Sequence, residues 1–389
     1  AWGVGAILVG LYAASRFRKM NVSTIPELFE QYYGKSARVI GVVGQLIIQM
    51  VITSLQYVAG GAILTALLPD YFTFSSGMLT TAVVFVGITL IGGYWAAGLS
   101  NVINVIVIYV GIVIGVFACV SNAGGFSEIA AKLPEGGAWF DPVAGVGLTL
   151  VIAWFIIMAT QAHSTQAVTQ ISFAAKDGKT ASRGFILGGL LILPVGFLSA
   201  VFGIVAAAQF PGLETAAMAL PKVVMELHPA VAGLTLAGLW AADVSTAVGL
   251  LLGSSTLVVR DIWKEYIQPN MTDKQEVLVS RLVVLVMSVF TYILATTVLG
   301  ILKTLLIGLT LTTAYTVILL FSMIAPKLCK KSAAFWTLIV GIGFLVLWVF
   351  VPAVHIVPDP IFIEWPLCVA TFLIAGVLDK RPATIPDSQ

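Results

Sequence analysis

The chain has 389 residues, of which 59% are hydrophobic and only 10% charged, and its mean hydropathy is +1.04. These values lie far outside the range of soluble globular domains. They indicate an integral membrane protein that is embedded in the lipid bilayer. The net charge of +2 is explained by basic loops and gives no reason to expect a nucleic-acid partner.

About eleven apolar windows run along the chain, each near the roughly 20 residues with which a helix crosses the hydrocarbon core. The windows are continuous and do not alternate, which favours an all-α protein over a barrel. The expected spans are 1–15, 38–67, 77–93, 99–120, 146–172, 183–208, 231–259, 279–299, 301–323, 334–352 and 361–378.

Lys and Arg occur mainly on alternate loops and in the C-terminal tail, and only Lys132, Lys222 and Lys303 lie on the other side. Because basic loops stay in the cytoplasm, we expect a multi-pass protein of the cell (inner) membrane with a cytoplasmic C-terminus. The chain begins inside an apolar segment with no initiator Met or charged leader, which indicates a fragment and not a signal peptide.

A short cytoplasmic helix is expected between the first two spans. The run from Ser23 to Leu28 offers a hydroxyl as N-cap, Pro26 in the first turn, and Glu27 where the helix dipole favours a negative charge. Gly34 should end this helix, which could equally be an ordinary loop helix without a function.

Polar side chains recur on one face of the 38–67 span. Gln49, Thr53 and Gln56 follow at spacings of four and three, and Gln45 extends the stripe. Amides at this depth can contact a solute, but they can also join neighbouring helices, and this second interpretation is favoured for the stripe alone.

The segment from residue 241 to 264 places Asp243, Ser245 and Thr246 inside an otherwise apolar span that ends at Arg260 and Asp261. Polar groups at membrane depth usually face a cavity and line an ion or substrate path. The alternative is that the two hydroxyls bond back to carbonyls one turn earlier, as hydroxyls in membrane helices often do.

Several other features bear on function. The 301–323 span carries a polar patch that could close a gate on either side of the membrane. The three cysteines have neither the spacing of a metal site nor that of a disulfide. We find no phosphate loop, metalloprotease helix or paired catalytic carboxylates, so we do not expect an enzyme. The patch comprises Thr310, Thr312, Thr313 and Tyr315, and the cysteines are Cys119, Cys329 and Cys368.

Four segments together resemble the sodium:solute symporter family. They are TIPELFEQYYGKSARV after the first span, IGGYWAAGLSNVINVIVIYVG with its Gly-Gly turn, QAVTQISFAAKDGKTASRG, and AADVSTAVGLLLGSSTLVVRDIWK with a small-hydroxyl pair and a closing Asp-Ile-aromatic-Lys. Their order and separations also match, and the resemblance covers residues from about 10 to about 330.

The resemblance implies a LeuT-like fold of two inverted five-helix repeats with binding sites at their interface near the membrane midplane. Residues 1–323 would form core helices two to ten, and 324–389 two peripheral helices and a short cytoplasmic tail. The first core helix of the family would then be missing from this chain. Two absent N-terminal helices, added to the eleven predicted spans, would give the thirteen-helix form of the family.

The resemblance also implies Na⁺ as the coupling ion, bound by the Ala242 carbonyl and the Ser245 and Thr246 hydroxyls, because sodium prefers oxygen ligands. Asp243 departs from the family, and Asn101 and Asn104 stand where the family commonly has Asp and Gln. We hypothesise that Asp243, near Asn101, replaces the lost carboxylate as a second sodium ligand or proton carrier, the alternative being a carboxylate bonded to a neighbouring helix.

The sixth core helix should unwind within the polar run from Thr160 to Gln166 and expose backbone to the cavity. Gln161 falls where sugar-transporting relatives carry a gating aromatic residue, which argues mildly against a stacked sugar. His163 could titrate near neutral pH, although a lone His among hydroxyls is more often structural. The candidate solute contacts are Gln161, Gln56, Gln49 and His163. At the end of this helix the chain has Gln170-Ile171 where the family has Gln-Arg.

The function expected from the resemblance is sodium-driven uptake of a small organic solute, of the amino-acid, monocarboxylate, vitamin or sugar class. A membrane sensor is the alternative, because similar domains occur fused to signalling kinases, although no output domain follows residue 378 here. A channel is less well supported because no ring-forming selectivity motif is present. The sequence leaves the solute, the oligomeric state and the choice between sodium and protons open.

Overall fold

The structure is a computed structural model that describes residues 1–134, 138–297 and 301–385. The side chains of residues 93–97, 100 and 301–303 lie outside the described part, and Lys303 of the predicted charge bias is among them. Within the described ranges the chain is helical with no β-strand, which confirms the predicted all-α class.

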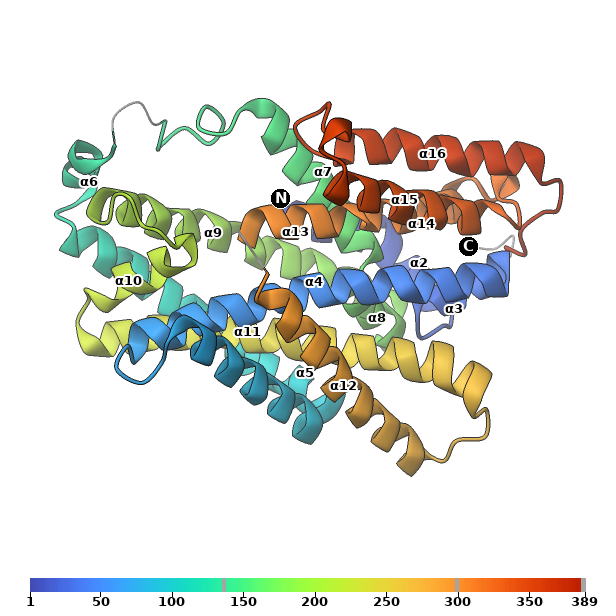
Figure 1. The fold of residues 1–389 in the computed structure, drawn as a ribbon, viewed down its shortest axis with the longest axis horizontal. Coiled ribbons are helices and arrows are strands. Elements are labelled where there is room, and N and C mark those ends of the chain that lie inside the picture. Colours follow the sequence, from blue (N-terminus) through green and yellow to red (C-terminus); the bar gives the residue numbers. More distant parts are fainter. Residues whose placement is uncertain (135–137, 298–300, 386–389) are drawn as a thin grey trace.

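The helices form an elongated bundle whose long axis is horizontal in Figure 1. Their bounds are α1 (Trp2–Leu8), η1 (Val9–Ala13), α2 (Ala14–Lys19), α3 (Ile25–Tyr33), α4 (Lys35–Leu67), α5 (Phe74–Asn122), α6 (Phe126–Lys132), α7 (Leu148–Ser164), α8 (Gln166–Ala174), α9 (Gly178–Gln209), η2 (Ala216–Met218), α10 (Ala219–Met225), α11 (Pro229–Val258), η3 (Val259–Ile267), α12 (Asp273–Ala295), α13 (Ile301–Thr310), α14 (Thr312–Ile324), η4 (Pro326–Leu328), α15 (Ala333–Phe350), η5 (Pro352–Val354) and α16 (Ile361–Leu378).

The number of membrane spans is roughly consistent with the eleven expected from the sequence. Among the described residues, 9 helices are long and apolar enough to cross a bilayer, and the bent pair α7 and α8 makes a tenth. The continuous helical run Trp2–Lys19, which includes the π-helical segment η1, accounts for the remaining predicted span.

Helix α5 contains two spans, Phe74–Gly92 and Asn101–Asn122, that run in opposite directions along α11. In the first, Phe74 lines one pocket with Lys222, which precedes α11, and Val86 packs with Leu251, so the residue number rises on both helices together. In the second, the backbone of Val107 approaches Gly238 and that of Gly111 approaches Leu234, so the residue number falls on α11 as it rises on α5. The chain therefore reverses between Val86 and Val107, where the Gly-Gly turn was expected.

The short helix α3 forms as its sequence predicts. The Thr24 hydroxyl accepts a hydrogen bond from the Glu27 amide at 3.1 Å, and Glu27 accepts one from the Ser23 amide at 2.7 Å. Gly34 ends the helix with φ of +104°, a conformation that favours glycine. The Tyr33 hydroxyl lies 2.6 Å from the Ser322 hydroxyl of α14, and burial raises the pKa of Tyr33.

The basic loops meet at one end of the bundle, which lies to the right in Figure 1. Lys35 after α3 pairs with Glu265 at the end of η3, at 3.9 Å, and the amide of Thr384 in the C-terminal tail bonds the Tyr32 carbonyl at 2.9 Å. Helices α6 and α10 lie at the opposite end. This grouping is what the loop charge pattern predicts for the cytoplasmic side.

Candidate functional site

The candidate site is the seam between α4 and α11. On α11, Ala242, Thr246 and Gly253 share one helical face, since they follow at spacings of four and seven. The Gly253 backbone lies against the Gln49 side chain of α4. The two helices run in opposite directions, because Arg38 at the start of α4 pairs with Asp261 just after α11.

The three predicted sodium-binding oxygens lie together on α11. The Ser245 hydroxyl donates to the Ala242 carbonyl at 2.8 Å, and the Thr246 hydroxyl donates to the same carbonyl at 2.9 Å. This is the back-bonded geometry that any membrane hydroxyl can adopt. It also clusters one carbonyl and two hydroxyls, and both hydroxyls can rotate their lone pairs toward a cation.

Exposure changes along the seam. Gln45, Gln49 and Thr53 are buried, at 0%, 0% and 1%, whereas Gln56 is half-buried and Thr246 is exposed. Gln49 of α4 contacts Gly253 of α11. Because the two helices are antiparallel, Gln56 lies level with Thr246 two turns away, about 10 Å farther along the bundle. The seam is thus closed at the end where the basic loops meet and more accessible toward the other end.

Gln49 is the most unusual group in the seam. Neither its amide nitrogen nor its amide oxygen has a hydrogen-bond partner among the described residues, although the side chain is fully buried. The Gln170 amide of α8 also faces Gly253, at 3.5 Å from where a Cβ would stand. A buried, unbonded amide is costly, so this position is suited to a polar ligand or water.

Asp243 and Asn101 lie at similar heights on packed helices. On α5 and α11, Gly111 lies beside Leu234 and Val107 beside Gly238. The same antiparallel register brings residues 101–104 of α5 level with residues 241–244 of α11. Asp243 is half-buried and has no hydrogen-bond or ion-pair partner among the described residues, and Asn101 is exposed. Both the link between the two and the alternative, a bond from Asp243 to a neighbouring helix, remain predictions.

The expected break in the sixth core helix is present at Thr165, where α7 and α8 meet at a bend of 45°. Gln161 and His163 instead contact the N-terminal helical run Trp2–Lys19. The Gln161 amide oxygen accepts a hydrogen bond from the Trp2 indole, and the His163 ring stacks on Tyr12 with centroids 5.1 Å apart. The four candidate solute contacts are therefore not brought into one cluster.

The polar patch of the tenth core helix is fully buried and braces the break. The Thr316 hydroxyl donates to the Thr160 carbonyl at 2.9 Å, and the Ser164 hydroxyl donates to the Thr312 carbonyl at the same distance. The Tyr315 hydroxyl donates to the Gly41 carbonyl of α4 at 2.6 Å. Tyr315, the Thr312 carbonyl and the adjacent Thr316 thus hold α14 against α4 and α7, whereas the Thr310 and Thr312 hydroxyls bond carbonyls of the preceding turn. Thr310, Thr312, Thr313 and Tyr315 each have 0% exposure.

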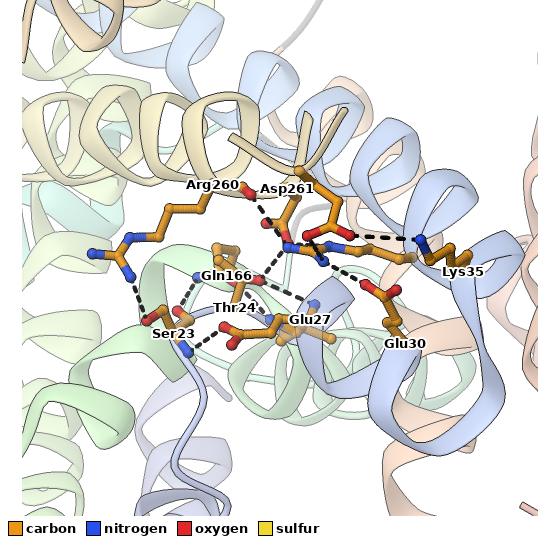
Figure 2. Close-up of polar contacts among 11 residues, drawn as sticks. Ser23, Thr24, Glu27, Glu30, Lys35, Gln166, Arg260 and Asp261 are labelled. Carbon is orange, nitrogen blue, oxygen red and sulfur yellow. Dashed lines mark hydrogen bonds and ion pairs between the residues drawn. The ribbon is translucent and has the colours of Figure 1, made fainter. Parts of the chain in front are cut away.

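A charged cluster lies at the end of the seam where the basic loops meet (Figure 2). Asp261, which is 1% exposed, accepts hydrogen bonds through one oxygen from Arg38 at 2.8 Å and from Thr24 at 2.9 Å. The Arg38 guanidinium also pairs with Glu30 and, at 3.1 Å, with Glu265. Buried charges need such pairing to offset the loss of hydration.

Sequence reasoning did not assign this cluster or the residue that connects to it. In the sequence, Arg38 is one of the basic loop residues, Asp261 belongs to the charged exit and the closing Asp-Ile-aromatic-Lys, and Gln166 ends a polar run. A buried Arg in one span and a buried Asp in another would have suggested the pair, because each needs a counter-ion. The joining of helices by amides is confirmed for Gln45, which bonds the backbone of α7 and α8.

The chain resembles known transporters over nearly its whole length. A family model described as the sodium:solute symporter family matches residues 2–341. The high-affinity proline transporter PutP of Bacillus subtilis is 25% identical over an alignment that covers 90% of this chain and 77% of the relative. The sodium/glucose cotransporter of Vibrio parahaemolyticus is 26% identical, with coverage of 71% and 56%.

Solved structures give the same fold at lower identity. A Na⁺-coupled sialic acid symporter in a substrate-bound outward-open state has a TM-score of 0.79 at 17% identity, and covers 98% of this chain and 83% of its own. A nucleobase-cation-symport-1 family transporter has a TM-score of 0.61 at 14% identity, with coverage of 97% and 82%. With the helix order and the four sequence segments, these matches identify the protein: it belongs to the sodium:solute symporter family.

Proposed function

We propose that the protein is a sodium-coupled symporter that takes up a small organic solute across the cell membrane by alternating access. The observation that carries this proposal is the clustering of the Ala242, Ser245 and Thr246 oxygens on the accessible part of the seam. Family membership supports the same conclusion, since the relatives named above are transporters and not enzymes.

Sodium would bind where the two hydroxyls now share the Ala242 carbonyl. A cation at this point gains three oxygen ligands from α11 alone when the Ser245 and Thr246 hydrogens turn away from it. Thr246 is exposed, so further ligands have access from the side of the seam. Coupling then requires that sodium bind one conformation better than the other.

The seam suggests how the solute and a second ion would be held. Gln56, level with Thr246, and the unbonded Gln49 amide supply donors and acceptors to a polar solute along one path. Gln161 and His163 would act from beside the N-terminal helical run. Asp243, with Asn101 nearby, is the candidate for a second sodium or a proton, because its carboxylate has no partner in the described chain.

The orientation and the division of the chain are part of the same proposal. The C-terminus and the charged cluster would face the cytoplasm, so the structure would correspond to a state closed on that side. Residues 1–323 would be the transporter core and 324–389 the peripheral helices and tail.

Sodium-driven uptake by the full-length protein in proteoliposomes tests this function. The solutes to try are those named for the relatives: proline, glucose, mannose, pantothenate and sialic acid. An inward sodium gradient should accumulate at least one solute, whereas an equal potassium gradient should not. Sodium-dependent binding without accumulation would instead favour the alternative, a membrane solute sensor.

A further inference from the structure

A single amide side chain spans the break between α7 and α8. Gln45 of α4 is fully buried; its amide nitrogen donates to the Ser164 carbonyl at 2.6 Å, and its oxygen accepts from the Gln166 amide at 2.9 Å. At the break the Val168 amide bonds the Thr165 carbonyl, not that of Ser164. Gln45 thus bonds two backbone groups that a continuous helix would pair internally.

A second amide carries the connection from the break to α3. The Gln166 side chain is also fully buried; its oxygen accepts from the Ile25 amide at 2.9 Å, and its nitrogen donates to the Ser23 carbonyl at 3.1 Å. These two groups flank Thr24, the N-cap of α3. Figure 2 shows Gln166 beside Ser23 and Thr24, facing the start of the short helix.

Thr24 joins this connection to the charged cluster. Its hydroxyl donates to Asp261, the same carboxylate oxygen that Arg38 binds. Arg38 further donates to the Arg260 carbonyl at 3.2 Å. An unbroken chain of hydrogen bonds therefore runs from α4 through the helix break and the start of α3 to η3, all of it buried or half-buried.

We propose that Gln45 and Gln166 are positioning residues that tie the helix break to the Arg38 and Asp261 pair and so keep this end of the seam closed. The break cannot shift relative to α4 without losing both Gln45 bonds, and α8 cannot leave α3 without losing both Gln166 bonds. The coupling itself follows from these contacts. Only the statement that opening this end releases solute into the cytoplasm rests on the proposed function.

The experiment measures how often this end opens. Ser172 of α8 is fully buried and its hydroxyl has no partner among the described residues, so Ser172→Cys gives a reporter that reacts with a maleimide only after α8 moves. The three native cysteines, all buried, are replaced by Ala. Labelling of the full-length protein is followed in detergent and KCl, without sodium or solute.

Gln45→Met and Gln166→Met should each raise the labelling rate about tenfold or more, because each removes two buried hydrogen bonds of the closed state. Ser54→Ala, which removes only a bond to the Val51 carbonyl of its own helix, is the matched control on α4 and should leave the rate unchanged. Asp261→Asn should also raise the rate. Its effect should combine with that of Gln45→Met less than additively, as expected for groups in one network.

Unchanged labelling in both Gln variants would overturn the proposal, and so would fully additive effects of Gln45→Met and Asp261→Asn. The outcome is separable from the proposed function. Increased labelling in variants of a protein that shows no sodium-driven uptake would uphold the coupling between break and cluster while rejecting symport.

Discussion

Gln49 of α4 and Gly253 of α11 are in direct contact, and the Gln49 amide oxygen occupies the space that a Cβ on Gly253 would need. The contact lies about 10 Å from Thr246 along α11, on the side of the charged cluster. The contact between Gln49 and Gly253 therefore marks the closed end of the seam that contains the proposed sodium site.

Gly238→Ala on α11 should destabilise the protein, because the new methyl group would stand 2.9 Å from the Val107 carbonyl oxygen of α5, a backbone atom that cannot turn away. Overpacking of this kind costs about 1–3 kcal/mol. The measurement is the melting temperature of the purified protein. Gly233→Ala on the same helix is the control, since a Cβ there meets nothing within 4 Å. Equal melting temperatures for the two variants would show that α5 and α11 pack more loosely than described.

Breaking the buried ion pair should cost far more than breaking an exposed one. Arg38→Gln leaves Asp261 without its cation, and removing one partner of a buried pair costs about 3–5 kcal/mol. Arg381→Gln, whose side chain is 76% exposed in its pair with Asp379, should cost far less, because water screens an exposed ion pair. Thermal unfolding of both variants measures the difference, and similar losses would argue against a structural role for the cluster.

Asp243→Asn should change ion coupling without unfolding the protein, because the carboxylate has no bonded partner to lose among the described residues. If Asp243 binds a second cation or a proton, the variant loses either one unit of sodium stoichiometry or the pH dependence of uptake. Reversal potentials and uptake from about pH 5.5 to 8.5 in proteoliposomes report on both. An unaltered stoichiometry together with an unaltered pH profile would reject this role.

Glu364 on α16 should be replaceable by Gln with a gain in stability. The carboxyl group is 0% exposed and both of its oxygens lack a partner among the described residues. Gln has the same shape and removes an ionisable group from a site where charge is costly. The melting temperature should rise for Glu364→Gln and stay constant for the exposed Glu226→Gln. A fall would mean that the acid makes a compensating contact.

The sequence predicted the fold well because long apolar runs, caps and loop charges act locally. The spans and the α3 caps at Thr24 and Gly34 follow from such signals, whereas the break beside Thr165 was expected from the family resemblance together with its polar run. The family resemblance supplied the arrangement of the helices, which periodicity alone does not determine.

The contacts within the site could be predicted only in part. Hydroxyls on α11 cluster within one turn, so Ser245 and Thr246 could be paired from spacing alone. Gln45, Gln166 and Asp261 come from three distant segments, and their connection depends on how those helices pack. Side-chain direction likewise separates Gln161 and His163 from the Gln49 stripe, which a list of polar residues does not reveal.

The most direct test of the account is the effect of sodium on the melting temperature of the full-length protein, measured in NaCl and in KCl at equal ionic strength. Binding to the folded state raises the melting temperature in proportion to the logarithm of ligand concentration above the dissociation constant. The wild type should melt at a higher temperature in NaCl, and the Ser245→Ala/Thr246→Ala variant should melt at one temperature in both salts. A sodium-specific shift that survives in this variant would contradict the sodium site on α11.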